Sequence, residues 1–263
     1  MPSRCGFSLD TYKTHPTNTT NRTPLRTRAS KSQVLPRLDT VYPLRLVRAL
    51  SAHLHGDRHF RGSADFYDPD NSCINLVLER RTGIPLTLSL VYMEVAARCG
   101  VELHGVNLPG RFLLTPADPE LEFFVDAFEL GAGGGVRTVA EVEETLGAIY
   151  GREVRVDAAF ARRAAPLPAR TLLARMCNNL QAIYASRGDY AAALAMSRYQ
   201  RLTRPEDVEE LRAQGLVLFA MGRHAEAAAA LREYLDRAPA DGPEVERVQR
   251  VLALMREMRG PGG

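Results

Sequence analysis

A repeat of 34 residues runs through the carboxy-terminal part of the chain and constrains its fold more than any other feature. The segment GDYAAA at 188–193 returns as GRHAEA at 222–227, and RP at 204–205 returns as AP at 238–239. In a helix-turn-helix unit, glycine makes the turn, a small residue lets the paired helices approach closely, and proline ends the second helix. The positions that define the repeat are Gly188, Ala193, Pro205, Gly222, Ala227 and Pro239.

This period is typical of tetratricopeptide modules, which present a concave groove to a peptide or helix of another protein. Two repeats are fewer than the three that a free-standing stack usually needs. We therefore expect capping by the amphipathic helix predicted at 243–258 and by the preceding domain. The alternative is that the repeats only brace that domain. The predicted all-α repeat domain covers residues 162–263, with a linker around Pro166 and Pro168.

Basic residues are concentrated at the amino terminus. Residues 1–38 hold seven Arg or Lys and a single acid, Asp10, so the net charge of +3 arises in this tail. The rest of the chain gives no reason to expect a nucleic-acid partner. A tail rich in Thr, Ser and Arg is typical of an organellar transit peptide. We therefore expect a disordered tail that directs the protein to a plastid; the alternative is a plain tail on a cytoplasmic protein.

The sequence predicts no membrane span, because its longest apolar stretch, 84–97, is interrupted by polar residues and is shorter than the roughly 20 residues required. The protein is expected to be soluble. No cofactor is predicted either, since the glycine run at 131–135 lacks the Lys-Ser or Lys-Thr of a phosphate loop. His53, His55 and His59 have only Asp57 nearby, so a solvated helix end is favoured over a metal site.

The segment 39–161 changes from helical to strand periodicity. Apolar residues recur at helical spacing in 44–54, 74–78 and 86–99, and then at every second position in short runs between 101 and 125. A last helix is predicted at 139–150 after the glycine-rich loop. Helices followed by an antiparallel meander predict an α+β domain.

Several motifs occur in order in this domain. They are RHFRG at 58–62, YDPDNS at 67–72, VLERRTGIPLTLS at 77–89, YMEVA at 92–96 and GVNLPGRFLL at 105–114. Together they resemble the SirB-type transglutaminase-like family, in which a tetratricopeptide region follows the first domain. The resemblance covers roughly residues 40–259. It implies a papain-like fold with a nucleophile at the start of a buried helix, a histidine on the following strand and an acid on the next.

The resemblance also implies that this triad is degenerate. Thr87 or Ser89 stands near the helix start in place of a thiol, Arg111 occupies the histidine position, and the acid survives as Asp126. Arginine stays protonated and cannot accept a proton from a hydroxyl, and a general base is typically worth about 10²–10⁴-fold in rate. As structural roles, the hydroxyls of Thr87 and Ser89 would cap the helix, and Arg111 would form an ion pair with Asp126.

Two functions therefore remain open. One is a catalytically silent transglutaminase-like domain fused to a peptide-binding repeat module, which acts as a scaffold or regulatory protein. The other is a cryptic amide or ester hydrolase or acyl transferase that uses Ser89 or Thr87 with His104 as the base and Asp126. Arg111 in the histidine position favours the first.

Overall fold

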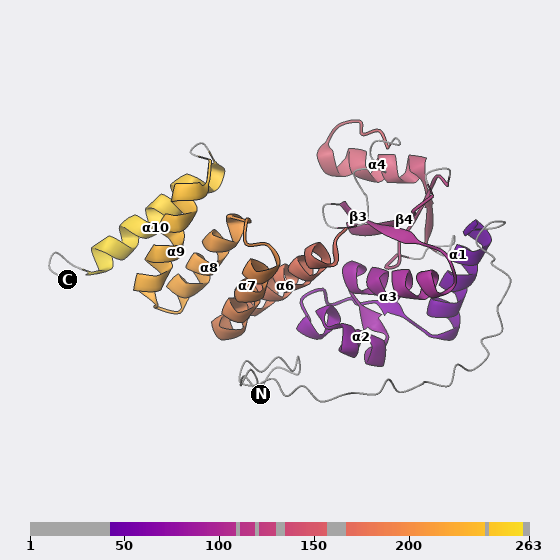
Figure 1. Cartoon of the computed structure of the whole chain (residues 1–263), viewed down its shortest axis with the longest axis horizontal. Coiled ribbons are helices and arrows are strands. Elements are labelled where there is room, and N and C mark those ends of the chain that lie inside the picture. Colours follow the sequence, from indigo (N-terminus) through magenta and orange to yellow (C-terminus); the bar gives the residue numbers. More distant parts are fainter. Residues whose placement is uncertain are drawn as a thin grey trace, which may run out of the picture.

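The computed structural model describes residues 43–108, 111–118, 121–129, 135–156, 167–239 and 242–259. The predicted tail of residues 1–38, most of the glycine run and Pro166 of the predicted linker lie outside the described residues. A mixed domain holds a sheet between layers of helices, and a helical arm extends from it (Figure 1). An α+β domain followed by helical repeats is the predicted architecture, and it is confirmed.

The first domain begins with short elements arranged around one long helix. They are α1 (Pro43–Ser51), the π-helical turn η3 (Ala52–Asp57), β1 (Arg61–Gly62), the 3₁₀ turn η4 (Pro69–Ser72), α2 (Ile74–Arg80), β2 (Thr82–Gly83) and α3 (Pro85–Arg98). Pro85 starts α3 at the position where its missing N–H costs nothing. Gly100, with a φ of 85°, lies just beyond its end. Because β1 pairs with β2 in parallel, the segment before η4 is held beside the start of α3.

The main sheet is an antiparallel meander. Its strands lie in the order β3 (Leu103–Leu108), β4 (Arg111–Pro116), β5 (Phe123–Val125) and β6 (Val136–Thr138). The sequence predicted the meander but not β6, whose three residues are too few to show a period of two. The helix that follows, α4 (Val139–Tyr150), has the predicted bounds.

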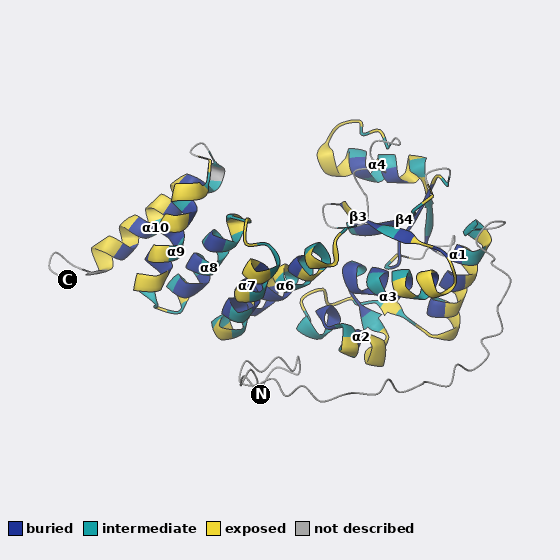
Figure 2. Ribbon diagram, viewed as in Figure 1, coloured by how far each residue is buried: buried dark blue, intermediate teal, exposed yellow. Residues whose placement is uncertain are grey.

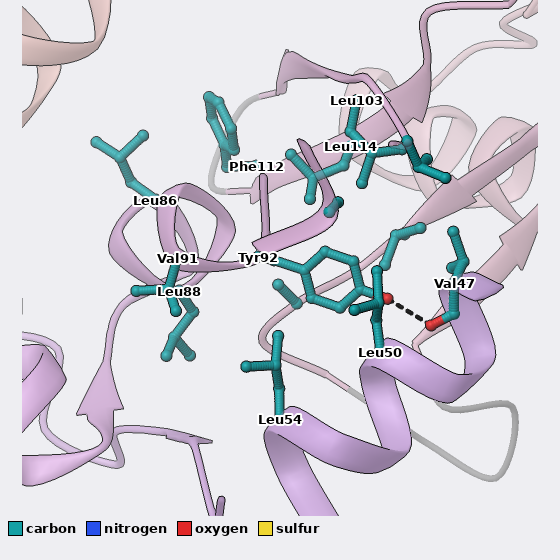
Figure 3. Close-up of a cluster of buried hydrophobic side chains, with 14 of the residues drawn as sticks. Val47, Leu50, Leu54, Leu86, Leu88, Val91, Tyr92, Leu103, Phe112 and Leu114 are labelled. Atoms are coloured by element: carbon teal, nitrogen blue, oxygen red, sulfur yellow. Dashed lines mark hydrogen bonds between the residues drawn. The ribbon is translucent and has the colours of Figure 1, made fainter. Parts of the chain in front are cut away.

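The two faces of the sheet bury different helices. Leu103, Phe112 and Leu114 pack against α3 and α1 in the principal core (Figure 3). The hydroxyl of Tyr92 on α3 donates a 2.6 Å hydrogen bond to the carbonyl oxygen of Val47, which ties α1 to this core (Figure 3). On the opposite face, Val106, Leu108, Leu113 and Phe124 pack against Val142 and Leu146 of α4.

The arm consists of paired helices. They are α6 (Ala169–Ser186), α7 (Tyr190–Thr203), α8 (Glu209–Ala220), α9 (His224–Arg237) and α10 (Pro243–Arg259). Gly188 and Gly222 make the turns within the two pairs with φ of 76° and 73°, which L-residues rarely adopt. Ala193 and Ala227 are fully buried where the paired helices approach. Figure 2 shows buried and exposed positions alternating along these helices, as amphipathic packing requires.

The two repeats carry different side chains at one equivalent contact between their paired helices. A Cβ on Gly215 would lie 2.5 Å from Cδ2 of Leu231, so the second repeat requires glycine there. In the first repeat the equivalent positions are Gln181 and Ser197, both buried. Gln181 accepts a 2.7 Å hydrogen bond from Gln200 across the helix pair. Ser197 is smaller than Leu231 and therefore leaves room for Gln181. The buried side-chain oxygen of Gln181 has Gln200 as its hydrogen-bond donor.

Helix α6 belongs to both domains. Leu172 and Met176 near its start pack against the principal core, whereas Leu180 and Tyr184 near its end belong to the core of the repeats. The first domain therefore covers one side of the repeat stack. At the opposite end of the stack, α10 buries Val245, Val248, Leu252 and Met255 against the repeat core.

Polar contacts extend the junction of the two domains along α6. The guanidinium of Arg175 lies 5.3 Å from the centre of the Phe112 ring and also contacts the Asn107 side chain. Arg187, at the other end of the helix, donates a 2.9 Å hydrogen bond to the carbonyl oxygen of Tyr67. Within the described part of the chain, no helix has the length and apolar character to cross a membrane.

Candidate functional site

A pocket of about 150 Å³ opens where α3 and β4 begin. It is lined by Phe66, Pro85, Arg111, Phe112, Asp126, Phe128 and Glu129. Pro85 is the first residue of α3 and Arg111 is the first of β4, so the pocket lies where the resemblance places a transglutaminase-like active site.

Thr87 lies under the helix start and is fully buried. Its Oγ1 donates a 2.8 Å hydrogen bond to the carbonyl oxygen of Asn71 and accepts one of 3.1 Å from the N–H of Ile84. Gly83 permits this arrangement, because a Cβ there would lie 2.7 Å from Oγ1. The hydroxyl thus joins the first turn of α3 to the end of η4, the structural role that a capping residue performs.

Ser89 is also fully buried. Its Oγ lies 3.5 Å from the carbonyl oxygen of Phe112, so its weak hydrogen bond points to the sheet. Neither Ser89 nor Thr87 is among the described residues that line the pocket. A nucleophile must touch its substrate, and both hydroxyls are instead buried in contacts with the backbone of Asn71 and Phe112.

Arg111 does reach the pocket and is engaged by two carboxylates. Its Nη1 lies 2.9 Å from Oε2 of Glu129 and 3.3 Å from Oδ2 of Asp126, and its Nη2 lies 3.4 Å from Oε1 of Glu129. The hydrogen bonds that Arg111 donates to Glu129, together with the charges of both carboxylates, raise the pKa of Arg111 above its ordinary value. The guanidinium is therefore a permanent cation and not a base.

Asp126 is held rigidly. Its side chain is only 5% exposed, and its Oδ1 accepts 2.9 Å hydrogen bonds from the N–H groups of Phe128 and Glu129. Such a turn fixes the chain that follows, so the same aspartate positions the Phe128 ring and the Glu129 carboxylate. The structure brings Arg111 and Asp126 together in the ion pair considered from the sequence.

His104 lies elsewhere. In β3 it shares a face with Val106 and Leu108, which pack against α4, while α3 covers the other face. Its Nε2 lies 3.3 Å from the exposed carboxylate of Glu102. The sheet therefore separates His104 from Thr87 and Ser89, and it does not place an imidazole beside either hydroxyl.

Two of the aromatic rings that line the pocket pack closely against glycine residues. A Cβ on Gly105 would lie 2.4 Å from the Phe112 ring, and one on Gly62 would lie 2.7 Å from the Phe128 ring. Each ring is packed directly onto the backbone of a neighbouring strand, and Arg175 covers Phe112 from α6. The walls of the pocket are thus positioned by β1, β3 and the first repeat helix.

Sequence reasoning missed Phe66, Phe128 and Glu129. The signal for the last two was their spacing from Asp126, since a buried aspartate often anchors the turn that follows it. Phe66 gave no comparable signal, because its position depends on the folding of the loop before η4. Asn71 organises that loop through 2.9 Å hydrogen bonds to Ser63 and Asp65.

The histidine cluster weighed as a metal site is not assembled. Nδ1 of His53 lies 3.0 Å from Oδ2 of Asp57, whereas Nδ1 of His55 donates to the carbonyl oxygen of Phe60 at 2.7 Å. In the described ranges, no group of three or more His, Cys, Asp or Glu side chains is arranged to hold a metal ion.

Comparison with known proteins places both parts of the chain. A family profile described as "Transglutaminase-like superfamily" matches residues 23–178, which is more than half of the chain, and one described as "Tetratricopeptide repeat" matches residues 180–253. No solved structure matches.

Curated relatives agree with these matches. A "UPF0162 protein" of Xylella fastidiosa (strain 9a5c) is 36% identical over 204 residues, which cover 76% of this chain and 70% of the relative. A "UPF0162 protein" of Pseudomonas aeruginosa is 36% identical over 126 residues, 48% of this chain and 43% of the relative. "F-box only protein 21" of Mus musculus is 37% identical over 117 residues, 39% of this chain and 18% of that protein. The chain belongs to the transglutaminase-like superfamily.

Proposed function

We propose that this member of the transglutaminase-like superfamily is a SirB-type protein whose first domain is catalytically silent and whose repeats bind another protein, so that it acts as a scaffold or regulatory protein. One observation carries the proposal. The pocket at the start of α3 is reached by the guanidinium of Arg111 but not by the hydroxyl of Thr87 or Ser89.

Two features support the proposal that the domain is silent: the absence of a base at the histidine position and the burial of the candidate nucleophiles. An activated hydroxyl needs a base within hydrogen-bond reach, and the group at the histidine position is a cation paired with Asp126 and Glu129. Exposing Thr87 would break its bonds to Asn71 and Ile84 and leave buried backbone groups unsatisfied, at about 1–3 kcal/mol each. The observed contacts thus favour a structural role for the hydroxyl that stands nearest to the helix start.

The organisation of the arm supports the proposal that it binds a partner protein. Pro243 stands 34 residues after Glu209, so α10 begins where the first helix of a third unit would begin. Leu216 and Phe219 of α8 are partly exposed, and Leu254 of α10 is 46% exposed. Tetratricopeptide repeats generally mediate contacts between proteins, and apolar side chains on successive first helices would supply the anchors for a peptide or helix.

The test compares two exposed leucines in the full chain. Leu254→Glu alters the proposed binding face, whereas Leu202→Glu alters an exposed residue near the end of α7, a second helix of a pair. Proximity labelling or affinity capture with the unmodified chain should identify a set of proteins that Leu202→Glu retains and Leu254→Glu loses. Equal capture by both variants, with Leu216→Glu also neutral, would show that this face does not bind partners.

A further inference from the structure

We propose that the pocket beside Arg111 is a receptor for an acidic peptide segment in which a carboxylate side chain lies next to an aromatic one, and that Glu129 occupies the carboxylate position in the unbound protein. The inference rests on the proposed function, in which this site binds and does not catalyse. It names the class of ligand that the site selects.

The two carboxylates on Arg111 differ in how firmly they are held. Asp126 is buried and fixed by two backbone N–H groups, so it remains in place when a ligand arrives. The Glu129 side chain is 49% exposed, and the facing Arg111 side chain is 36% exposed. Glu129 is therefore the displaceable partner.

The energies favour exchange. A solvent-exposed ion pair contributes little free energy, so an incoming carboxylate that also buries apolar surface can replace Glu129. The fork of the Arg111 guanidinium, which already meets both oxygens of Glu129, fits any carboxylate in the same way. Arg137, with Nη2 3.8 Å from Oε2 of Glu129, adds a second positive charge beside the vacated position.

The apolar part of the pocket selects an aromatic group. Phe66, Phe112 and Phe128 line it together with Pro85, and a cavity of about 150 Å³ is large enough to admit a benzene ring. Two of these rings are seated on glycine backbones, so they form a preorganised wall. Ring pairs in offset or edge-to-face contact add a specific attraction to the gain from burying apolar area, so the site favours an aromatic side chain over an aliphatic one.

The chain itself offers the same chemistry. Phe128 and Glu129 are adjacent, one lining the pocket with its ring and the other placing its carboxylate on Arg111. A partner segment with an acid beside an aromatic residue would replace the Glu129 carboxylate on Arg111 and place its own ring against Phe66, Phe112 or Phe128. A basic segment offers no carboxylate to replace Glu129 on Arg111, and it would lie beside the like charges of Arg111 and Arg137, so it is selected against.

The experiment is a titration of the full chain followed by NMR chemical shifts, with acetyl-Glu-Phe-amide and acetyl-Phe-Glu-amide as probes. At least one should bind, whereas the corresponding peptides with Gln for Glu, Ala for Phe or Lys for Glu should bind at least about threefold more weakly. Glu129→Gln removes the internal competitor and should tighten binding about three- to fivefold, which corresponds to the energy of an exposed ion pair. Glu144→Gln, an exposed position on α4, is the matched control and should leave affinity unchanged.

Arg111→Met should abolish binding, with a thermal melt to establish that the variant is folded. Equal affinity of the Glu and Gln probes, preference for the Lys probe, or no gain in Glu129→Gln would each overturn the inference. Cleavage or deamidation of a probe would instead contradict the proposed function. Failure of every probe to bind, without any turnover, would overturn only the inference.

Discussion

The hydroxyl of Thr87 donates a 2.8 Å hydrogen bond to the carbonyl oxygen of Asn71, which joins the first turn of α3 to η4, the turn that follows the loop carrying Phe66. Both residues are fully buried. The residue nearest to the nucleophile position of the family is thus part of the scaffold that shapes the pocket. This relationship gives the structural role of Thr87 a direct test.

Thr87→Val keeps the shape of the side chain and removes the hydroxyl. We expect it to lower the free energy of unfolding by about 1–3 kcal/mol, because the Asn71 carbonyl and the Ile84 N–H lose a buried partner. Urea unfolding of the full chain measures the change. Ser89→Ala is the comparison and should cost less, since its contact to Phe112 is 3.5 Å long. A larger loss of stability in Ser89→Ala than in Thr87→Val would contradict the structural role assigned to Thr87.

The position of α6 in two cores predicts that the domains unfold together. Leu172→Asp places an uncompensated charge against the principal core, although the residue lies on a repeat helix. We expect a loss of several kcal/mol and a single shifted transition, monitored in the sheet domain and in the arm by hydrogen exchange. Leu180→Asp, in the repeat core, should likewise destabilise both domains.

Leu173→Asp is the matched control for this pair. Leu173 is the neighbour of Leu172 in the same helix but is 51% exposed, so its substitution should change stability by less than about 0.5 kcal/mol. If Leu172→Asp lowered protection from hydrogen exchange only in the arm, the two domains would unfold independently of each other.

Much of the fold was predictable because it depends on local spacing. The 34-residue repeat, the bounds of α4 and the order of β3, β4 and β5 follow from turn residues and from the period of apolar positions. β6 was missed because three residues carry no period. The pairing of Gln181 with Gln200 was also missed, since the compensating small residue, Ser197, lies on the neighbouring helix.

The candidate site was predictable only in part. The resemblance brought Arg111 and Asp126 to one place, because family motifs fix the order of helix and strands. It did not predict that Glu129 would share Arg111 or that Phe66 would line the pocket. These contacts arise from a turn and a loop, whose paths depend on tertiary hydrogen bonds such as those of Asn71. His104 was considered as a base because its sequence position does not reveal which face of the sheet it occupies.

Glu210 on α8 predicts how stability depends on pH. Its Oε2 is buried without a hydrogen-bond partner among the described residues, and burial followed by the charge of Asp207 raises the pKa of Glu210 to about 7 from an ordinary 4.5. Below pH 4.5 Glu210 is protonated in both the folded and the unfolded chain, so its raised pKa does not lower the free energy of unfolding. As the pH rises from 4.5 to 7, Glu210 ionises first in the unfolded chain, and the free energy of unfolding falls. Glu210→Gln should therefore raise the free energy of unfolding at pH 8 by about 2 kcal/mol, after allowance for partial solvation.

Urea unfolding at pH 4.5 and pH 8 checks this sign. At the lower pH, Glu210→Gln and the unmodified chain should be nearly equal in stability. Glu246→Gln, an exposed position on α10, should show no pH-dependent gain. A stabilisation by Glu210→Gln that is the same at both pH values would argue that ionisation of Glu210 is not the cause.

The central claim is that the transglutaminase-like domain is silent, and turnover by the purified full chain tests it most directly. Glutamine–amine transfer, peptide cleavage and ester hydrolysis should each stay at the rate of buffer alone, since Arg111 lines the pocket while Thr87 and Ser89 are fully buried and do not line it. Arg111→His should not restore activity, because it supplies a base but no accessible nucleophile. Turnover by the unmodified chain that disappears in folded Ser89→Ala or Thr87→Val would contradict the account.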